Sequence, residues 1–478
     1  MKTSLIIVQI LVLYSSFRLD TGVKTYNEYY HAPAFAGKRP DPEALAVGKI
    51  IDSVFCPADP TQSYALYVPA SGRGKKLPII YFFDPHGDGA LPLKKYKSLA
   101  ETYGFILTGS NNSKNGNDWL TTEHIWHILY EDSKNRLMFN SERMYACGFS
   151  GGAKVAGYIA LKFPGLKGVI ANGAGLPDGT LPGDFNFSFT AIAGQGDMNM
   201  TDLIIFSEDL DNTRTRHHFI LFDGKHEWAP ENSMDLAFSG LQLDAMQQGI
   251  IAKDEAYINH YFKKSKKNLD SFYRVDLLVK AGQQCKLSIS ILEGLSEKEA
   301  GWFMEKLRSL QGNPDFIKQQ AFYEDLLSRE QHTKEEYIKH FQQEDTAYWN
   351  KTISDLKKKA GSKTEQAGMY SRLLAFLSLA FYSFSNHLIN TNENSEAWHY
   401  VSLYKMADPA NSEAWYFSAI LHARENLGRE TENDLLKAAD CGFRDENRMI
   451  QQTEFRNLSP KINLSRVENR MRNTPNDK

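Results

Sequence analysis

The sequence predicts an α/β fold, with a mostly parallel sheet flanked by helices, followed by an all-α domain. Apolar strand-like runs alternate with helix-like runs from residue 49 to residue 222, which is typical of such a sheet. A Gly-x-Ser-x-Gly pattern at residues 148–152 lies between a predicted strand and a predicted helix. After Pro230 the strand-like runs give way to helical periodicity with polar, charged faces.

The strands expected in the first part of the chain are short apolar runs bounded by turn residues. They cover residues 49–56, 64–68, 77–83, 104–108, 143–147, 167–172, 188–193 and 218–222, and a turn at 57–62 joins the first two. Helices are expected at residues 93–103, 122–137, 152–163, 200–210 and 230–250. Chemistry in parallel sheets lies at the carboxyl ends of the strands, so the loops after these strands are candidate site loops.

Residues 251–478 are predicted to form the helical domain. Residues 251–360 have the pattern of polar, amphipathic helices, with one doubtful strand signal near 286–291. The run 370–384 is more apolar, but Arg372 and three serines within it favour a buried core helix over a membrane span. The tail after Arg466 is polar and is expected to lack fixed structure.

An internal repeat lies in the helical domain. The tetrapeptide SEAW occurs at residues 395–398 and again at 412–415, a spacing of 17 residues, and a helix-length run follows each copy. Two helices in about 34 residues is the period of tetratricopeptide repeats, which this segment resembles most clearly over residues 371–445. Such repeats present concave surfaces to proteins or peptides, so a partner of that kind is expected there. An unrelated helical bundle is the alternative.

Length and charge restrict the class of protein. A chain of 478 residues suggests two or three domains, and 42% hydrophobic residues is ordinary for a globular protein. The formal net charge is −3, and no block of lysines and arginines resembles a nucleic-acid-binding patch. A nucleic-acid partner is therefore not expected.

Residues 1–22 are predicted to be a secretory signal, and residues 23–250 the first domain. Lys2 precedes an apolar stretch at residues 5–14 that is too short to span a bilayer comfortably. The expected location is secreted, periplasmic or otherwise extracytoplasmic, with no membrane span beyond this signal; an uncleaved anchor is the alternative. The widely spaced cysteines do not have metal-site spacing, and although disulfides are compatible with export, Cys147 is expected in the core.

Three residues in separate strand-end loops suggest nucleophilic catalysis. A serine hydroxyl attacks a carbonyl only when a base accepts its proton and a carboxylate orients that base. Ser150, Asp197 and His226 occur in the order nucleophile, acid, base, and each follows a predicted strand. All three are therefore expected at one edge of the sheet.

The same reaction needs donors for the negative oxygen of its intermediate. The backbone N–H of Gly151, directly after the serine, is one expected donor. The other is expected at the N–H of Asp88 in the sequence PHGDG, which follows the strand at residues 77–83 and resembles the oxyanion loops of esterases. Its neighbours His86 and Gly87 are expected to line the substrate cleft.

Residues 48–250 resemble an α/β-hydrolase of the dienelactone hydrolase, polyhydroxyalkanoate depolymerase and feruloyl esterase type. The resemblance rests on FDPHGDG, CGFSGGAK, AGQGD and FDGKHEW, of which the last three match in order and spacing. These motifs are specific for the superfamily but not for a substrate. Dienelactone hydrolases use a cysteine nucleophile, whereas this chain has Ser150, which favours ester hydrolysis over their reaction.

Several of these residues have structural alternatives. Asp197 has the residue type of a helix N-cap, in which case Asp202 would be the acid. His226 and Glu227 could serve only their own loop, and His86 is expected to brace its loop rather than to react. Asn111 and Asn112, like Asn115, either line the cleft or form an Asx-rich turn.

The sequence as a whole predicts an exported serine hydrolase, most simply a carboxylic-ester hydrolase without metal or organic cofactor. The short segment 173–184 leaves little room for a cap over the site, so a polymer-attached ester would be accommodated. One alternative is an adaptor protein that binds partners through its repeats and keeps the hydrolase fold as a non-catalytic scaffold. The other is a serine peptidase, because the triad is the same.

Overall fold

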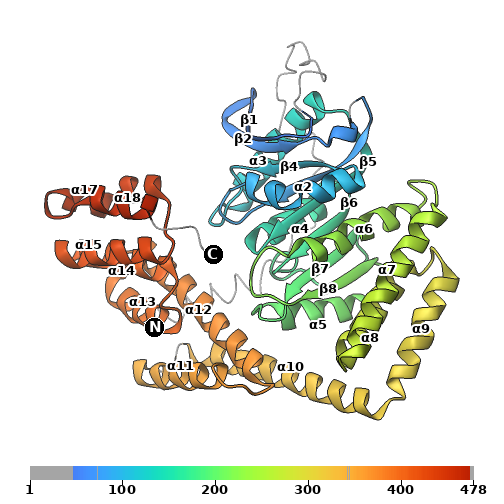
Figure 1. The fold of residues 1–478 in the computed structure, drawn as a ribbon. Helices are drawn as coiled ribbons and strands as arrows, with labels where there is room; N and C mark the ends of the chain where they lie inside the picture. Colours follow the sequence, from blue (N-terminus) through green and yellow to red (C-terminus); the bar gives the residue numbers. More distant parts are fainter. Residues whose placement is uncertain (1–46, 73, 342, 344, 474–478) are drawn as a thin grey trace. The chain divides into compact units, whose positions relative to one another are not determined.

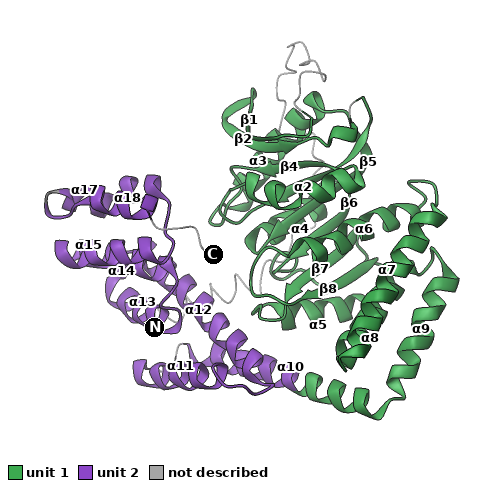
Figure 2. Ribbon diagram, in the orientation of Figure 1, with its two compact units in different colours: residues 1–325 green, residues 326–478 purple. Residues whose placement is uncertain are grey.

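The computed structural model describes residues 47–473 apart from residues 73, 342 and 344 (Figure 1). It divides into two compact units, residues 1–325 and residues 326–478 (Figure 2). The first unit therefore continues past the predicted domain boundary at residue 250. The predicted signal at residues 1–22 lies outside the described residues, and export stays a prediction.

Within the described residues, unit 1 is built on an eight-stranded sheet with the order β1-β2-β4-β3-β5-β6-β7-β8. The β1/β2 and β2/β4 pairs are antiparallel, and all other pairs are parallel. The strands are β1 (Ile50–Cys56), β2 (Asp59–Tyr67), β3 (Leu77–Phe83), β4 (Ile106–Ser110), β5 (Phe139–Phe149), β6 (Leu166–Asn172), β7 (Ser188–Gly194) and β8 (His217–Phe222). The sheet is thus mostly parallel, as predicted.

Helices cover both faces of this sheet (Figure 1). One face packs against α2 (Ala90–Tyr103) and α6 (Glu231–Gln247), and the other against α3 (Trp119–Arg136), α4 (Gly151–Lys162) and α5 (Met200–Leu210). A short 3-10 turn, η3 (Ala70–Gly72), precedes β3. A mostly parallel sheet, helices on both faces and a serine at a strand-to-helix turn are the features of the α/β-hydrolase fold. The sequence-based fold class is confirmed.

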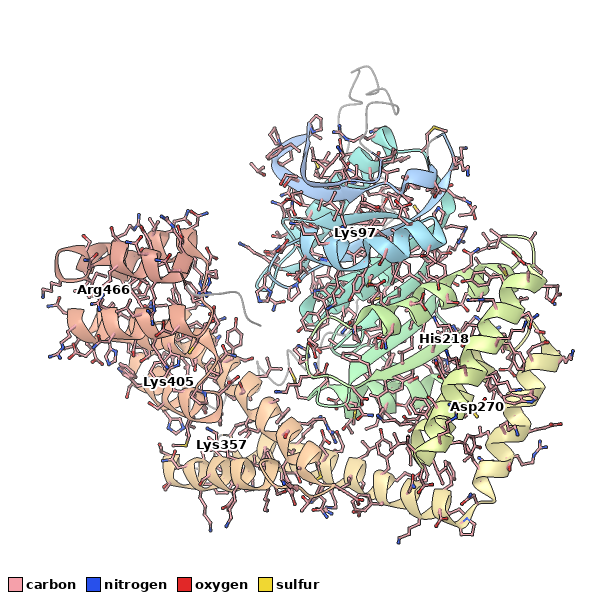
Figure 3. The ribbon with its side chains drawn as sticks, in the orientation of Figure 1. Lys97, His218, Asp270, Lys357, Lys405 and Arg466 are labelled. Atoms are coloured by element: carbon pink, nitrogen blue, oxygen red, sulfur yellow. The ribbon has the colours of Figure 1, made fainter. Side chains whose placement is uncertain are left out.

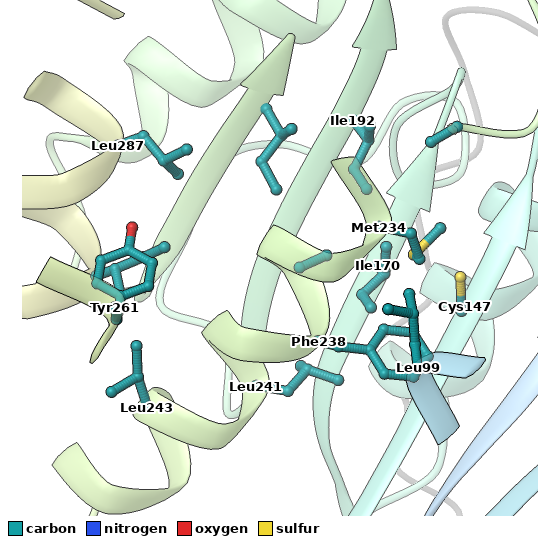
Figure 4. Close-up of a cluster of buried hydrophobic side chains, with 14 of the residues drawn as sticks. Leu99, Cys147, Ile170, Ile192, Met234, Phe238, Leu241, Leu243, Tyr261 and Leu287 are labelled. Carbon is teal, nitrogen blue, oxygen red and sulfur yellow. The ribbon is translucent and has the colours of Figure 1, made fainter. Parts of the chain in front are cut away.

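Three further helices belong to unit 1: α7 (Glu255–Arg274), α8 (Leu278–Leu292) and α9 (Glu297–Gln311). Their buried side chains, such as Tyr261, Leu287 and Phe303, share one apolar cluster with the sheet and α6. Figure 4 shows Tyr261 and Leu287 in the same cluster as Phe238 of α6 and Ile192 of β7. Because these helices complete the core over one face of the sheet, no domain boundary falls at residue 250.

The strand signal near residues 286–291 was wrong, because this segment lies in α8. Leu287, Ile289 and Ile291 alternate with polar residues and so imitate a strand. The helix nevertheless buries Ala281, Cys285 and Leu292 as well, at helical spacing. The turn between the first two strands is also shorter than predicted, because β2 begins at Asp59.

All four cysteines lie within the described residues and are free thiols, so none forms a disulfide. Cys147 is fully buried on β5, as predicted for a core residue (Figure 4). Burial raises the pKa of its thiol well above the ordinary value, which keeps it protonated and unreactive.

A buried polar cluster joins β8 to α6 and α8. The His218 ring contacts the Asp244 carboxylate through Nε2 at 3.0 Å and the Ser290 hydroxyl through Nδ1 at 2.9 Å. Arg216 donates to Asp244 and to the Ile291 carbonyl. His218 on β8 is labelled in Figure 3. Burial lowers the pKa of His218. Burial alone would raise the pKa of Asp244, but the neighbouring His218 and Arg216 lower it to about 2.

This cluster predicts a stability that falls in acid. Below about pH 6.5 the unfolded chain gains a proton on residue 218 that the folded protein resists, so the free energy of unfolding should decrease as the pH falls. A second decrease should follow below about pH 4, as Asp244 is protonated more easily in the unfolded chain. Urea unfolding of the full chain between pH 8 and pH 5 measures the first slope. His218→Gln should flatten it, whereas His217→Gln, which leaves the cluster intact, should not; equal slopes in wild type and His218→Gln contradict the account.

Unit 2 is helical throughout its described part. Its elements are α10 (Pro314–His340), inside which the division between the units falls, α11 (Thr346–Ala360), α12 (Ala367–Asn390), α13 (Asn394–Ala407), α14 (Ser412–Arg424), α15 (Gly428–Asp440), α16 (Glu446–Gln451), α17 (Thr453–Leu458), η4 (Ser459–Lys461) and α18 (Leu464–Asn473). The two SEAW copies begin α13 and α14, and their alanines, Ala397 and Ala414, are fully buried. The repeat thus marks two consecutive helices, and its assignment to the tetratricopeptide family stays a prediction.

The sequence predicts a core helix at residues 370–384 and no fixed structure after Arg466, and the structure agrees with the first and contradicts the second. Among the described residues, α12 is the one helix long and apolar enough to cross a membrane by length and composition. It packs against α11 and α13, and Arg372 on it forms a buried ion pair with Glu330 of α10, as in a core helix. The tail after Arg466 is not without structure, because α18 contains it as far as Asn473 and Arg472 pairs with Glu446.

Candidate active site

The loop from β5 to α4 holds Ser150 in a strained backbone conformation, with φ 53° and ψ −122°. A non-glycine residue at positive φ costs on the order of 1–3 kcal/mol and persists only where its surroundings enforce it. Two close approaches enforce it here. A Cβ atom on Gly148 would lie 2.0 Å from the Gly152 carbonyl oxygen, and one on Gly152 would lie 1.9 Å from that of Phe83. Glycine at both positions therefore allows the sharp strand-to-helix turn.

The three residues predicted from separate loops are brought together. The Ser150 Oγ lies 2.9 Å from His226 Nε2, and the His226 Nδ1 lies 3.1 and 3.0 Å from the two carboxylate oxygens of Asp197. A carboxylate only accepts, so Nδ1 carries the proton and Nε2 is left to accept from the serine hydroxyl. Asp197 is fully buried, and the His226 ring packs at 4.8 Å on the ring of Phe149.

The structure distinguishes between the alternatives for the acid. Asp197 does not cap α5, because the N-cap position is Asn199. Its carboxylate instead accepts from the Asn199 N–H as well as from His226, and both bonds fix its orientation. Asp202 is exposed in the first turn of α5, and the carboxylate beside His226 is that of Asp197.

Buried side chains that the sequence analysis missed hold the histidine loop in place. The side chain of Asn172, at the end of β6, donates through Nδ2 to the Glu227 carbonyl and accepts from the Ala229 N–H through Oδ1. Its backbone carbonyl accepts from the Ser150 N–H. Asp84, at the end of β3, accepts from Trp228 Nε1 at 2.9 Å. Burial would raise the pKa of Asp84, but bonds from His86 and Trp228 lower it, so it is an anion at neutral pH. A polar residue at the end of an apolar strand is the sequence signal that would have identified both.

The loops expected to supply the oxyanion donors lie at the same sheet edge. Within the described residues, neither the Asp88 N–H nor the Gly151 N–H has a hydrogen-bond acceptor. Gly87 has φ +77°, and its N–H bonds the Asp84 carbonyl in a tight turn. The exposed His86 lies with Nδ1 3.5 Å from the Asp84 carboxylate, consistent with the loop-bracing role expected for it. The role of the two N–H groups as donors is taken up below.

The asparagines after β4 do not all serve the same purpose. Asn111 donates to the Asp52 carbonyl and Asn112 to the Thr61 carbonyl, so both side chains fasten the β1–β2 hairpin. These bonds join distant segments, so they give both side chains a structural role that differs from the local Asx turn offered as the alternative. Asn115 differs because its side chain lies against the β5–α4 loop: a Cβ atom on Gly151 would lie 1.9 Å from its Oδ1.

Glu227 accepts from the Lys225 N–H within its own loop. Among the described residues no group of three or more His, Cys, Asp or Glu side chains could hold a metal ion.

No protein-family model matches the chain, and neither does any curated protein. Solved structures with a similar arrangement include an esterase from Pyrobaculum calidifontis, with 11% identity over 43% of this chain and 87% of that one and a TM-score of 0.33. A ferulic acid esterase has 16% identity over 41% and 96% of the two chains and a TM-score of 0.33. An S-formylglutathione hydrolase from Agrobacterium tumefaciens has 16% identity over 38% and 89% and a TM-score of 0.29.

The class of protein therefore rests on the structure itself. Unit 1 has the α/β-hydrolase fold, a serine hydrolase fold, with a serine, a histidine and a buried aspartate hydrogen-bonded in sequence at the carboxyl edge of its sheet. The low identities and TM-scores of the solved structures add nothing about substrate.

Proposed function

We propose that this protein is a serine esterase, and that Ser150, His226 and Asp197 are its catalytic triad. The observation that carries the proposal is the unbroken chain of hydrogen bonds from the Ser150 hydroxyl through both nitrogens of His226 to the buried Asp197. A serine in unstrained backbone geometry, or a histidine without a carboxylate partner, would be explained by a structural role alone. Here the strained serine, its base and its acid are hydrogen-bonded to one another at one site.

The proposed reaction has two halves. The Ser150 oxygen attacks the ester carbonyl carbon while its proton passes to His226 Nε2. Collapse of the tetrahedral intermediate breaks the bond to the alcohol, which leaves with the proton from His226. Water then attacks the acyl-enzyme by the same route and releases the acid. Asp197 stabilises the imidazolium that forms in each half, and the N–H groups of Gly151 and Asp88 stabilise the negative oxygen.

The loop between β6 and β7 favours an exposed cleft in unit 1. Residues 173–187 contain no helix or strand, and an ion pair between Lys154 of α4 and Asp178 fastens this loop to the body of the unit. At its far end Thr215 bonds Gly183 and Phe185. A loop anchored in this way is not a cap domain, so the proposed substrate is an ester whose alcohol part can be bulky, including one attached to a polymer.

The proposal is tested with purified full-length chain and a series of p-nitrophenyl esters with acetyl, butyryl, long-chain and aromatic acyl groups. We expect turnover of at least one ester, and a burst of nitrophenolate equal to the enzyme concentration wherever deacylation is slow. Matched anilides distinguish the peptidase alternative, because a peptidase would cleave the amide as well. A folded protein that hydrolyses none of these compounds would leave the adaptor alternative.

A second function is proposed for unit 2, because a specific cavity favours it. A pocket of about 430 Å³ lies between α12, α14 and α16–α17. Polar side chains that line it include Asn386, Asn390, Arg424, Arg448 and Gln452. Arg448 is already paired with Glu413 and Arg424 with Glu454, so the walls offer neutral amides more than free charge. Amides suit the peptide backbone, so the ligand proposed is an extended peptide segment. Selection from a random peptide library on wild-type protein, with Asn386→Ala and Asn390→Ala as counter-screens, tests it; peptides that bind all three equally well would place binding elsewhere.

A further inference from the structure

The side chain of Asn115 lies directly against the residue that follows the proposed nucleophile. A Cβ atom built on Gly151 would lie 1.9 Å from Asn115 Oδ1, 3.0 Å from its Cγ and 3.5 Å from its Nδ2. The carboxamide therefore occupies the space that any side chain at residue 151 would need. Glycine at residue 151 is required for this approach.

The backbone of Asn115 connects it to the second oxyanion loop. Its N–H donates to the Pro85 carbonyl at 2.8 Å, and Pro85 lies in the loop that carries Asp88. Asn115 thus touches Gly151 with its side chain and the 84–89 loop with its main chain. It lies between the two segments whose N–H groups are proposed to hold the negative oxygen.

The carboxamide itself is unused in the described part of the chain. The carboxamides of the neighbouring asparagines are hydrogen-bonded to the protein: Asn111 and Asn112 bond the β1–β2 hairpin, and Asn117 bonds the Asn112 carbonyl. Asn115 is exposed, and neither end of its carboxamide has a hydrogen-bond partner among the described residues. A carboxamide held at this place without a protein partner is available to a bound molecule.

From this geometry we infer that Asn115 is a substrate-binding residue whose Nδ2 donates a hydrogen bond to the reacting acyl group, as a third donor to the oxygen that becomes negative. The inference rests on the proposed esterase function. With Oδ1 against Gly151, the amino end is the one left for the substrate. A neutral donor at this position stabilises developing charge, whereas a carboxylate there would repel it.

Two substitutions separate this role from a merely structural one. Asn115→Ala removes the donor and should lower kcat by about 10- to 100-fold, less than the loss of a buried oxyanion donor, with a smaller change in KM. Asn115→Asp keeps the shape but places a negative charge beside the oxyanion. Its kcat should fall further than that of Asn115→Ala at pH 7 and should recover toward the Asn115→Ala value as the pH is lowered toward the ordinary carboxyl pKa of about 4.

The control is Asn117→Ala, which removes a bond within the same loop, although Asn117 supplies none of the three atoms nearest to a Cβ on Gly151. If Asn115 acted only by ordering the loop, this variant would lose as much kcat as Asn115→Ala, and the Asp variant would show no extra pH dependence. Wild-type kcat in both Asn115 variants would overturn the inference while leaving the esterase proposal intact. Absence of turnover in the wild type would instead reject the esterase proposal, and the inference with it.

Discussion

Replacing Ser150 with alanine should lower kcat for the best p-nitrophenyl ester by on the order of 10⁴- to 10⁶-fold, with the fold unchanged. The hydroxyl is the atom that bonds the acyl group, and no other nucleophile is described within reach of His226. Backbone donors and binding account for the small residual rate. Steady-state kinetics on the purified variant, with circular dichroism to confirm folding, measure the effect.

The protein contains its own control for this experiment. Ser290, His218 and Asp244 are also hydrogen-bonded in sequence, at 2.9 and 3.0 Å. His218, however, is 1% exposed and lies at the start of β8 rather than at its carboxyl end, so no substrate reaches it. Ser290→Ala should therefore keep wild-type kcat. Comparable turnover in Ser150→Ala and wild type, or a matching loss in Ser290→Ala, would mean that the wrong serine has been assigned.

The second large effect is expected for Asp197→Asn, which should lower kcat by about 10⁴-fold at neutral pH. An amide of the same shape can donate to Nδ1 and so stabilise the tautomer in which Nε2 carries the proton. Such a histidine cannot accept the proton of Ser150. The loss should also be largely in kcat, because the buried Asp197 does not line the cleft.

Asp202→Asn is the matched control, since it makes the same chemical change five residues further along the chain, in the first turn of α5. It should leave kcat within a few-fold of wild type. A large loss in Asp202→Asn together with a small one in Asp197→Asn would restore the alternative assignment of the acid.

The sequence predicted most of the sheet because its strands are short apolar runs between turns. The strand Leu77–Phe83 and the helix Met200–Leu210 have the predicted bounds. Ser150, Asp197 and His226 could be predicted for the same reason, because a residue that directly follows a parallel strand has its position fixed by the sheet. Because the three strand ends lie at one edge of the sheet, these side chains are close enough to form hydrogen bonds.

What the sequence could not show depends on contacts between distant segments. Asn172 bonds a loop 55 residues further along the chain, and Trp228 reaches Asp84 across 144 residues. No local pattern encodes such pairs. The membership of α7–α9 in the first unit is of the same kind, because Tyr261 and Leu287 follow ordinary helical periodicity and only the packing shows that they cover the sheet. In α8, isoleucines that alternate with polar residues have the pattern of a strand. Only the burial of Cys285 and Leu292 shows that the segment is a helix.

The central claim, that Ser150 is activated by His226, is tested most directly by a fluorophosphonate probe and mass spectrometry of the full chain. The account predicts one covalent adduct, located on the peptide that contains Ser150, and labelling at least 100-fold slower in His226→Ala because the base that accepts the serine proton is gone. An adduct on another residue, or equal labelling rates with and without the imidazole at position 226, would contradict it.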